Sequence, residues 1–250
     1  MFYLSKKQLK EEELPAGHRS PDWPSRLAQL AEQARNPSLK AFYEAGVVAA
    51  NTPISEVPLV AMDFETTGID ASRDEIVSIG LVSMSLERIR MSESQHWILK
   101  PRADLRDESV VIHGITHSEV ESAPDLTRIR EQLLETLAGR VVVVHHKGIE
   151  RKFLDAALKR RIGEGIEFPC IDTMELEARL HRRKPSGLID KLFGQKPRVS
   201  IRLPESRERY HLPHYPAHNA LTDALSCAEL LQAQVAHRFS PDTPVSTLWS

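Results

Sequence analysis

Residues 62–68 read Met-Asp-Phe-Glu-Thr-Thr-Gly and directly follow the apolar residues 59–61. Residues 57–65 together predict a buried strand, on which side chains two positions apart share a face. Asp63 and Glu65 should therefore project together at the end of this strand. Adjacent carboxylates repel each other, and hard oxygen ligands of this kind suit Mg²⁺ or Mn²⁺. A strand that simply emerges into solvent would give the same pair, so this motif alone does not decide between the two.

A second segment, residues 217–239, is predicted to form the last long helix. Its alanines at positions 217, 220 and 224 make a small-residue face that can lie close to a sheet. The candidate functional residues are His218 and Asp223, which an ideal helix would place about 140° apart. They could flank one site only if His218 lies at a frayed first turn. Taken alone, a surface histidine and an exposed aspartate are the simpler interpretation.

A third segment begins with four consecutive valines, residues 141–144, which predict a short buried strand. A turn and a helix over residues 150–161 should follow, with Glu150 in the first turn. The helix dipole favours an acid there, so capping is an alternative role for Glu150. The tandem His145-His146 could suggest zinc. Adjacent residues on a strand face opposite ways, however, and no other ligand pattern joins the two histidines.

The remaining patterns predict the organisation of the chain. Strands are expected over residues 75–84 and 96–99, and helices over residues 27–34, 38–45, 126–137, 173–181 and 188–193. Strands that come first, with helices expected on both sides of the sheet, indicate an α/β fold with a mixed sheet. We expect three parts: a helical N-terminal extension over residues 1–55, a main domain over residues 56–240, and a C-terminal tail over residues 241–250.

Composition limits the class of protein. The chain has 250 residues, of which 41% are hydrophobic and 27% charged, as in an ordinary globular protein. It contains no apolar run of about 18 residues and no apolar core of a signal peptide, so a cytoplasmic protein without membrane spans is expected. The two cysteines show no zinc spacing. Basic clusters at residues 159–161 and 182–184 could face a phosphate backbone, or could be ordinary solvated helix surface.

Taken in order, the three segments resemble the DnaQ-like, DEDDh-type 3′–5′ exonucleases, a family that includes the exonuclease domain of the DNA polymerase III epsilon subunit. Residues 74–80, 113–116 and 171–173 add supporting motifs, and the resemblance covers about residues 58–235. It implies a ribonuclease H-like mixed sheet flanked by helices. It also implies two Mg²⁺ or Mn²⁺ ions and a histidine general base, His218. The acids that would hold the ions are Asp63, Glu65, Glu150 and Asp223.

The resemblance further implies which residues hold the substrate. Thr66, Thr67 and Gly68 would position the 3′ end, and His113 and Ile115 would line the nucleotide pocket.

Two features depart from the family pattern. The middle acid is usually Asp in a segment that reads His-Asn-Ala-x-Phe-Asp, whereas here residues 145–150 read His-His-Lys-Gly-Ile-Glu. The side chain of Glu150 is therefore one methylene longer than that of the usual Asp, and it must reach the metal site from further away. In addition, the epsilon subunit holds its polymerase with a longer C-terminal tail, while this chain carries its extra residues at the N-terminus. Association with a polymerase is thus possible but not indicated.

The expected function is metal-dependent hydrolysis of single-stranded nucleic acid from its 3′ end to nucleoside 5′-monophosphates, with DNA favoured over RNA. Two alternatives stay open: an RNA-trimming exoribonuclease of the same fold, and a module that binds 3′ ends without cutting. The presence of all four acids and His218 argues against the binding module. Recognition of a 2′-OH would distinguish RNA from DNA, but no residue of the sequence indicates whether this chain makes such a contact.

Overall fold

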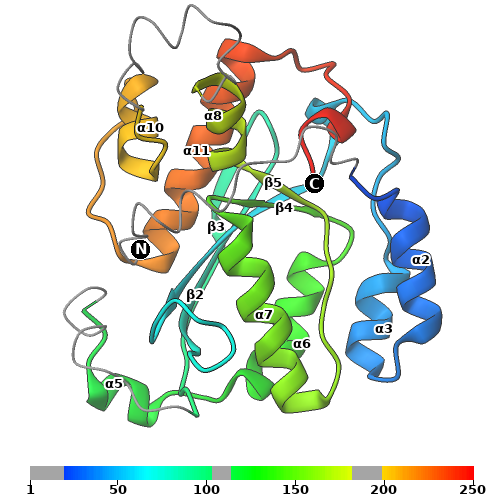
Figure 1. Cartoon of the computed structure of the whole chain (residues 1–250), viewed down its shortest axis with the longest axis vertical. Helices are drawn as coiled ribbons and strands as arrows, with labels where there is room; N and C mark the ends of the chain where they lie inside the picture. Colours follow the sequence, from blue (N-terminus) through cyan, green and yellow to red (C-terminus); the bar gives the residue numbers. More distant parts are fainter. Residues whose placement is uncertain (1–19, 103–113, 182–198) are drawn as a thin grey trace, which may run out of the picture.

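The computed structural model describes residues 20–102, 114–181 and 199–250. Figure 1 shows a sheet in the middle of the molecule with helices around it. The strand order is β3-β2-β1-β4-β5. The strands are β1 (Leu59–Thr66), β2 (Ile76–Met84), β3 (Ile89–Ile98), β4 (Val141–Val144) and β5 (Cys170–Asp172). The pairs β1–β2 and β2–β3 are antiparallel, and β1–β4 and β4–β5 are parallel. This is the mixed, ribonuclease H-like sheet that the sequence predicted.

The helices that flank the sheet are α6 (Leu126–Leu137), α7 (Lys147–Ile162), α8 (Thr173–His181), α10 (Leu203–Arg209) and α11 (Ala220–Arg238). A shorter helix, α5 (His117–Ser122), precedes α6. Helix α11 packs against β1 and β2, while α7 contacts β1, β2 and β5 (Figure 1). Every residue of β1, β2 and β4 is buried, which explains why these strands have apolar sequences with little alternation.

Helix α11 approaches the sheet very closely at one glycine. Gly80 on β2 pairs with Asp63 on β1, and a Cβ added to Gly80 would lie 2.3 Å from the carbonyl carbon of Ala220. No residue with a side chain fits this position without moving the helix. The small-residue face predicted for this helix is therefore what brings its N-terminal end to the acidic end of β1.

Several predicted boundaries were wrong. Helix α11 begins three residues later than expected, because Asn219 caps it with a side-chain oxygen that accepts a hydrogen bond from the Thr222 N–H. Helix α7 begins three residues earlier than expected, at Lys147. Strand β3 begins at Ile89, seven residues before the predicted start. Strand β5 and helices α5 and α10 were not predicted as elements, and the helix expected at residues 188–193 lies outside the described residues.

The N-terminal helices α2 (Trp23–Gln33) and α3 (Pro37–Glu44) share the hydrophobic core of the sheet domain. Helix α3 packs against α6, and Arg26 on α2 forms a two-pronged ion pair with Glu167. The C-terminal residues are also packed: Trp249 is 3% exposed and forms a bridge with Ile171 on β5. The divisions at residues 55 and 240 stay predictions. The described helices include none that is both long and apolar enough to cross a bilayer.

The contact at Gly80 leads to a test. Gly80→Ala should lower the free energy of unfolding by about 1–3 kcal/mol, because the new methyl group must displace α11 from the sheet. The displacement would also move Asp223 away from β1, so the affinity for Mn²⁺ should fall. Urea unfolding and Mn²⁺ titration would measure the two effects.

Gly163→Ala is the matched control. Gly163 ends α7 with φ of 76°, and no atom lies within 4 Å of an added Cβ. This variant should lose about 1–2 kcal/mol from backbone strain alone and keep its Mn²⁺ affinity. Equal metal affinity in both variants would show that the close approach does not position the acids.

Candidate active site

Three of the predicted acids come together at the end of β1. Asp63 and Glu65 lie on the same face of the strand, and Asp223 reaches them from the first turn of α11. Each residue offers a carboxylate oxygen, and these three atoms lie within 4.8 Å of one another. All three residues are at least nine-tenths buried. The strand does not simply emerge into solvent at this point, so the simpler interpretation of the Asp63–Glu65 pair was wrong.

Burial and mutual repulsion make it costly for these carboxylates to be ionised. Burial raises the pKa of Asp63 well above its usual range, and the charges of Asp223, Glu65 and Glu150 raise it further. Burial raises the pKa of Glu65 to about 7, and burial also raises that of Asp223. A divalent cation would reverse this balance, because it supplies the opposite charge to the ionised forms. The donor set, made of carboxylate oxygens alone, is that of a hard cation.

The fourth predicted acid, Glu150, lies beside this group rather than within it. Glu150 is in the first turn of α7 and only 2% exposed, and its charge raises the pKa of Asp63. It is not among the three acids whose oxygens lie within 4.8 Å of one another. The other acid of α7 near the site, Asp155, is not a substitute. Its carboxylate pairs with Lys159 at 2.8 Å and accepts the Ile166 N–H, so it points away.

A carboxylate that the sequence analysis did not single out, Asp172, holds the helix that carries Glu150. Its oxygens accept hydrogen bonds from the backbone N–H groups of His146 and Lys147 at the start of α7, both at 3.0 Å. They also accept from Met174 and Glu175 at the start of α8. One buried side chain thus satisfies N–H groups of two helix ends, where an anion is favoured. The only signal for it in the sequence was the motif at residues 171–173.

The two adjacent histidines do not form a zinc pair. The His145 ring is hydrogen-bonded through Nδ1 to Thr173 at 2.8 Å and through Nε2 to the carbonyl oxygen of Ile201 at 3.1 Å. Burial lowers the pKa of His145 to about 4, so it is a neutral, structural side chain. His146 precedes α7 with φ of 105°, a left-handed conformation that is unusual for a residue with a Cβ.

His218 lies outside α11, which was the condition for it to share a site with Asp223. It precedes the cap residue Asn219 and has a left-handed backbone, with φ of 72°. Its backbone N–H donates to Asp223 Oδ2 at 2.9 Å, which fixes the turn against the acid cluster. Burial lowers the pKa of the imidazole, so the ring is mainly neutral near pH 7.

Three of the residues expected to hold the substrate, Thr66, Thr67 and Gly68, form a closed turn at the end of β1. The Thr66 hydroxyl donates to the Gly68 carbonyl oxygen at 2.6 Å, and the Thr67 hydroxyl accepts the Glu75 N–H at 3.0 Å. The hydroxyl of Thr67 therefore closes the turn. Ile115 is half-buried just before α5, and His113 lies outside the described residues. The contacts of these residues with a substrate stay predictions.

The basic cluster at residues 159–161 does not form a free phosphate-binding surface. The Arg161 side chain is only 3% exposed, and both Arg160 and Arg161 pair with Glu75. Lys159 is exposed but pairs with Asp155. Both interpretations of this cluster, a surface that faces a nucleic-acid backbone and a solvated helix face, were therefore wrong for Arg161. For Arg160, whose side chain is 29% exposed, contact with a nucleic-acid backbone stays a prediction. The cluster at residues 182–184 lies outside the described residues.

Comparison with known proteins identifies the family of this chain. The exonuclease family model of the RNase T type matches residues 60–231. The PolC-type DNA polymerase III of Thermotoga maritima is 29% identical over 138 residues, which are 55% of this chain and 10% of that protein. The DNA polymerase III subunit epsilon of Treponema pallidum is 27% identical over 181 residues, 72% of this chain and 78% of that protein. The chain thus spans only about a tenth of the first relative.

A solved structure shares the fold. The nuclease domain of 3′hExo, described as a DEDDh family member bound to rAMP, superposes with a TM-score of 0.59 at 15% identity. The match covers 72% of this chain and 92% of that domain.

The raised pKa of Glu65 predicts an unusual dependence of stability on pH. Folding without metal raises this pKa from 4.5 to about 7, so the folded protein holds the proton more tightly than the unfolded chain. The resulting stabilisation is complete below about pH 4.5 and is lost as the pH rises through 7. In EDTA, the wild-type protein should therefore lose stability relative to Glu65→Gln between pH 5 and 8, by on the order of 2–3 kcal/mol.

Comparison with the variant is needed because His145 acts in the opposite direction. Its pKa is lowered in the folded state, so its contribution is lost as the pH falls below its usual value of 6.5. Glu65→Gln leaves that contribution in place in both proteins. Urea unfolding at each pH gives the difference, and Mn²⁺ should stabilise the wild type more than the variant at pH 8. A constant difference across the pH range would contradict the prediction.

Proposed function

Since this chain belongs to the exonuclease family whose model it matches, we propose that it hydrolyses nucleic acid from the 3′ end and releases nucleoside 5′-monophosphates. The observation that carries the proposal is the buried group of Asp63, Glu65 and Asp223, with His218 held beside it on a left-handed backbone. Buried acids whose like charges repel one another are typical of a functional site rather than of a purely structural one.

The acids that would hold two divalent ions, Mg²⁺ or Mn²⁺, are Asp63, Glu65, Glu150 and Asp223. When bound, such ions supply an activated water on one side of the phosphodiester and stabilise the departing 3′ oxygen on the other. The raised pKa values of Asp63, Glu65 and Asp223 support this assignment, because ionising these carboxyl groups in the metal-free protein costs free energy. Glu150 would complete the set from α7.

His218 acts as the general base in this proposal. Burial lowers the pKa of its imidazole, so the ring is available near neutral pH to accept a proton from the attacking water. The hydrogen bond from its backbone N–H to Asp223 keeps the residue next to the metal acids. Thr66 and Gly68 would hold the terminal nucleotide from the turn after β1, and Ile115 would lie against its base.

Single-stranded DNA is the favoured substrate. The similar Thermotoga and Treponema proteins carry the names of DNA polymerase III components, which supports DNA. An RNA-trimming activity is the second candidate, because the 3′hExo domain was solved with rAMP.

The test is to incubate the pure protein with end-labelled single-stranded DNA and RNA of the same sequence, with Mg²⁺, Mn²⁺ or EDTA. We expect stepwise shortening from the 3′ end, release of nucleoside 5′-monophosphates, and faster turnover of DNA. Degradation that continues in EDTA, or that starts at the 5′ end, would refute the proposal. Tight binding of 3′ ends without cleavage would favour the binding module instead.

His218→Asn tests the general base. Asparagine tolerates the left-handed backbone of this position better than alanine does, so the turn should survive the change. Turnover should fall by roughly 10²–10⁴-fold, while Mn²⁺ affinity should stay close to that of the wild type. Loss of Mn²⁺ binding in a folded His218→Asn protein would instead make His218 a metal ligand.

Glu150→Gln tests the fourth acid. The change keeps the size of the side chain and removes one anionic ligand, so activity should fall by at least about tenfold with folding intact. Glu150→Asp restores the charge with a shorter reach and should recover part of the activity. Asp155→Asn is the control on the same helix and should leave activity unchanged. If Glu150 only stabilises its helix, Glu150→Gln would cost about 1 kcal/mol of stability and leave catalysis alone.

A further inference from the structure

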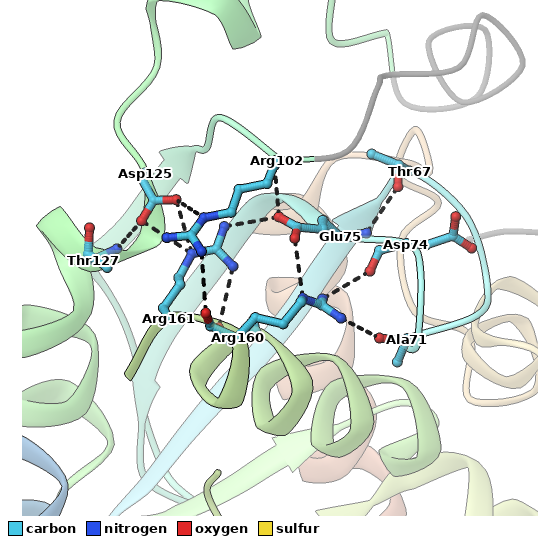
Figure 2. A network of polar contacts seen from close by, with 10 residues as sticks. Thr67, Ala71, Asp74, Glu75, Arg102, Asp125, Thr127, Arg160 and Arg161 are labelled. Atoms are coloured by element: carbon cyan, nitrogen blue, oxygen red, sulfur yellow. Dashed lines mark hydrogen bonds and ion pairs between the residues drawn. The ribbon is translucent and has the colours of Figure 1, made fainter. Parts of the chain in front are cut away.

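The loop that joins β1 to β2 begins with the proposed 3′-end turn and is held in place by the far end of α7 (Figure 2). Within the loop, the Asp70 N–H donates to Asp74 Oδ2 at 2.9 Å, and the Asp74 N–H donates to the Asp70 carbonyl oxygen at 2.7 Å. The carboxyl group of Asp74 also covers Gly68, where a Cβ would lie 2.2 Å from its Oδ2. These bonds give the loop a shape of its own, but none of them joins it to α7.

Arg160 joins this loop to α7. Its Nη1 donates to the Ala71 carbonyl oxygen at 2.8 Å, its Nη2 donates to the Asp74 carbonyl oxygen at 3.2 Å, and its Nε lies 3.3 Å from Glu75 Oε1. One guanidinium therefore contacts three separate points of the loop. A planar, five-donor group can satisfy such an arrangement, whereas a lysine ammonium cannot satisfy all of it.

Glu75 connects this contact to the proposed 3′-end turn. Its backbone N–H donates to the Thr67 hydroxyl, and its carbonyl oxygen accepts the Thr67 N–H at 2.9 Å. Its carboxylate also accepts from Arg161 Nη2 and from the Arg102 N–H, both at 2.9 Å. A displacement of Glu75 would therefore also displace Thr67 and its neighbour Gly68.

The neighbouring arginine has a different role. Arg161 has a side chain only 3% exposed, and it joins Glu75 to Asp125, which caps α6. Loss of Arg161 would remove this cation from the buried carboxylate of Glu75 and from the partly exposed carboxylate of Asp125, so its effect would be on folding first. The side chain of Arg160 is 29% exposed, and two of its three contacts are to loop carbonyl oxygens. Arg160 is therefore the residue that can be changed with the core intact.

We propose that Arg160 is a positioning residue for the proposed exonuclease, which fixes the 67–75 loop so that the turn after β1 meets the 3′-terminal nucleotide at the metal acids. The proposal rests on the function proposed above. Helix α7 carries Glu150 at one end and Arg160 ten residues later, about 15 Å along its axis. The same helix thus contacts the acid site and the loop that would hold the substrate.

Arg160→Met tests the proposal, because it keeps a long apolar stem and removes every donor. We expect KM for a single-stranded oligonucleotide to rise about tenfold, with kcat changed less than about twofold. The reason is that the variant loses binding energy that the ground state and the transition state share equally. Amide hydrogen exchange of residues 67–75 should become faster. Mn²⁺ affinity should stay unchanged, because the four acids are untouched. Arg160→Lys should recover part of the effect on KM.

Arg26→Met is the matched control. Arg26 also forms a two-pronged pair with a carboxylate, that of Glu167, but it lies on α2 and does not contact the loop. The Arg26→Met variant should have the KM, the kcat and the hydrogen-exchange rate of residues 67–75 of the wild type.

Two results would overturn the proposal: an Arg160→Met protein that is less stable but has unchanged KM, or one whose loop exchanges at the wild-type rate. Failure of the proposed function is a separate result, because then the wild-type protein itself would not cleave DNA or RNA with Mg²⁺ or Mn²⁺. Loop exchange in Arg160→Met needs no activity, and it would still decide whether Arg160 places the loop.

Discussion

The carboxylates of Asp63, Glu65 and Asp223 repel one another in a place where water cannot screen them, and the surrounding fold has to hold them there. β1 supplies two of the acids and cannot relax, because all eight of its residues are buried between β2 and β4. α11 supplies the third and is pressed against the sheet at Gly80. The free energy of packing thus maintains an arrangement that electrostatics alone would disperse. A site of this kind is stable only as part of a large core, or with cations bound.

The second constraint is the placement of helix ends. Asp172 holds the start of α7, and Asn219 holds the start of α11, so each helix begins at a residue that a polar side chain determines. These caps explain why both helices begin three residues away from the positions that hydrophobic periodicity predicted. They also place His218 outside α11, where its backbone can adopt the left-handed conformation that turns it toward Asp223.

The parts of the fold that could be predicted were those with a strong apolar pattern. The buried strands β1, β2 and β4 were predicted within a few residues, because burial on both faces leaves a continuous apolar run. β3 was placed too late because its first half is exposed and polar, as in Arg90 and Glu93. β5 has only three residues, too few for any periodicity. Charge was the least informative pattern: the partner of Arg160 and Arg161 is Glu75, about 85 residues earlier, and nothing local to residues 159–161 indicates it.

The acids and His218 were recognised because their motifs occur in the order of a known family, and the structure brings Asp63, Glu65 and Asp223 together as expected. The link between Asp172 and α7 was missed because it joins residues 25 and 26 positions apart, which no local pattern shows.

Helix α7 has a consequence for which changes of sequence the protein can accept. Insertion of one residue between Glu150 and Arg160 would turn one end of the helix by about 100° relative to the other and lengthen it by about 1.5 Å. Either Glu150 would leave the acids or Arg160 would leave the loop, whichever residue was inserted. Most substitutions on the outer surface of the helix have no such effect. This helix should therefore diverge in composition while keeping its length, and length variation among similar proteins should be confined to the connections around it.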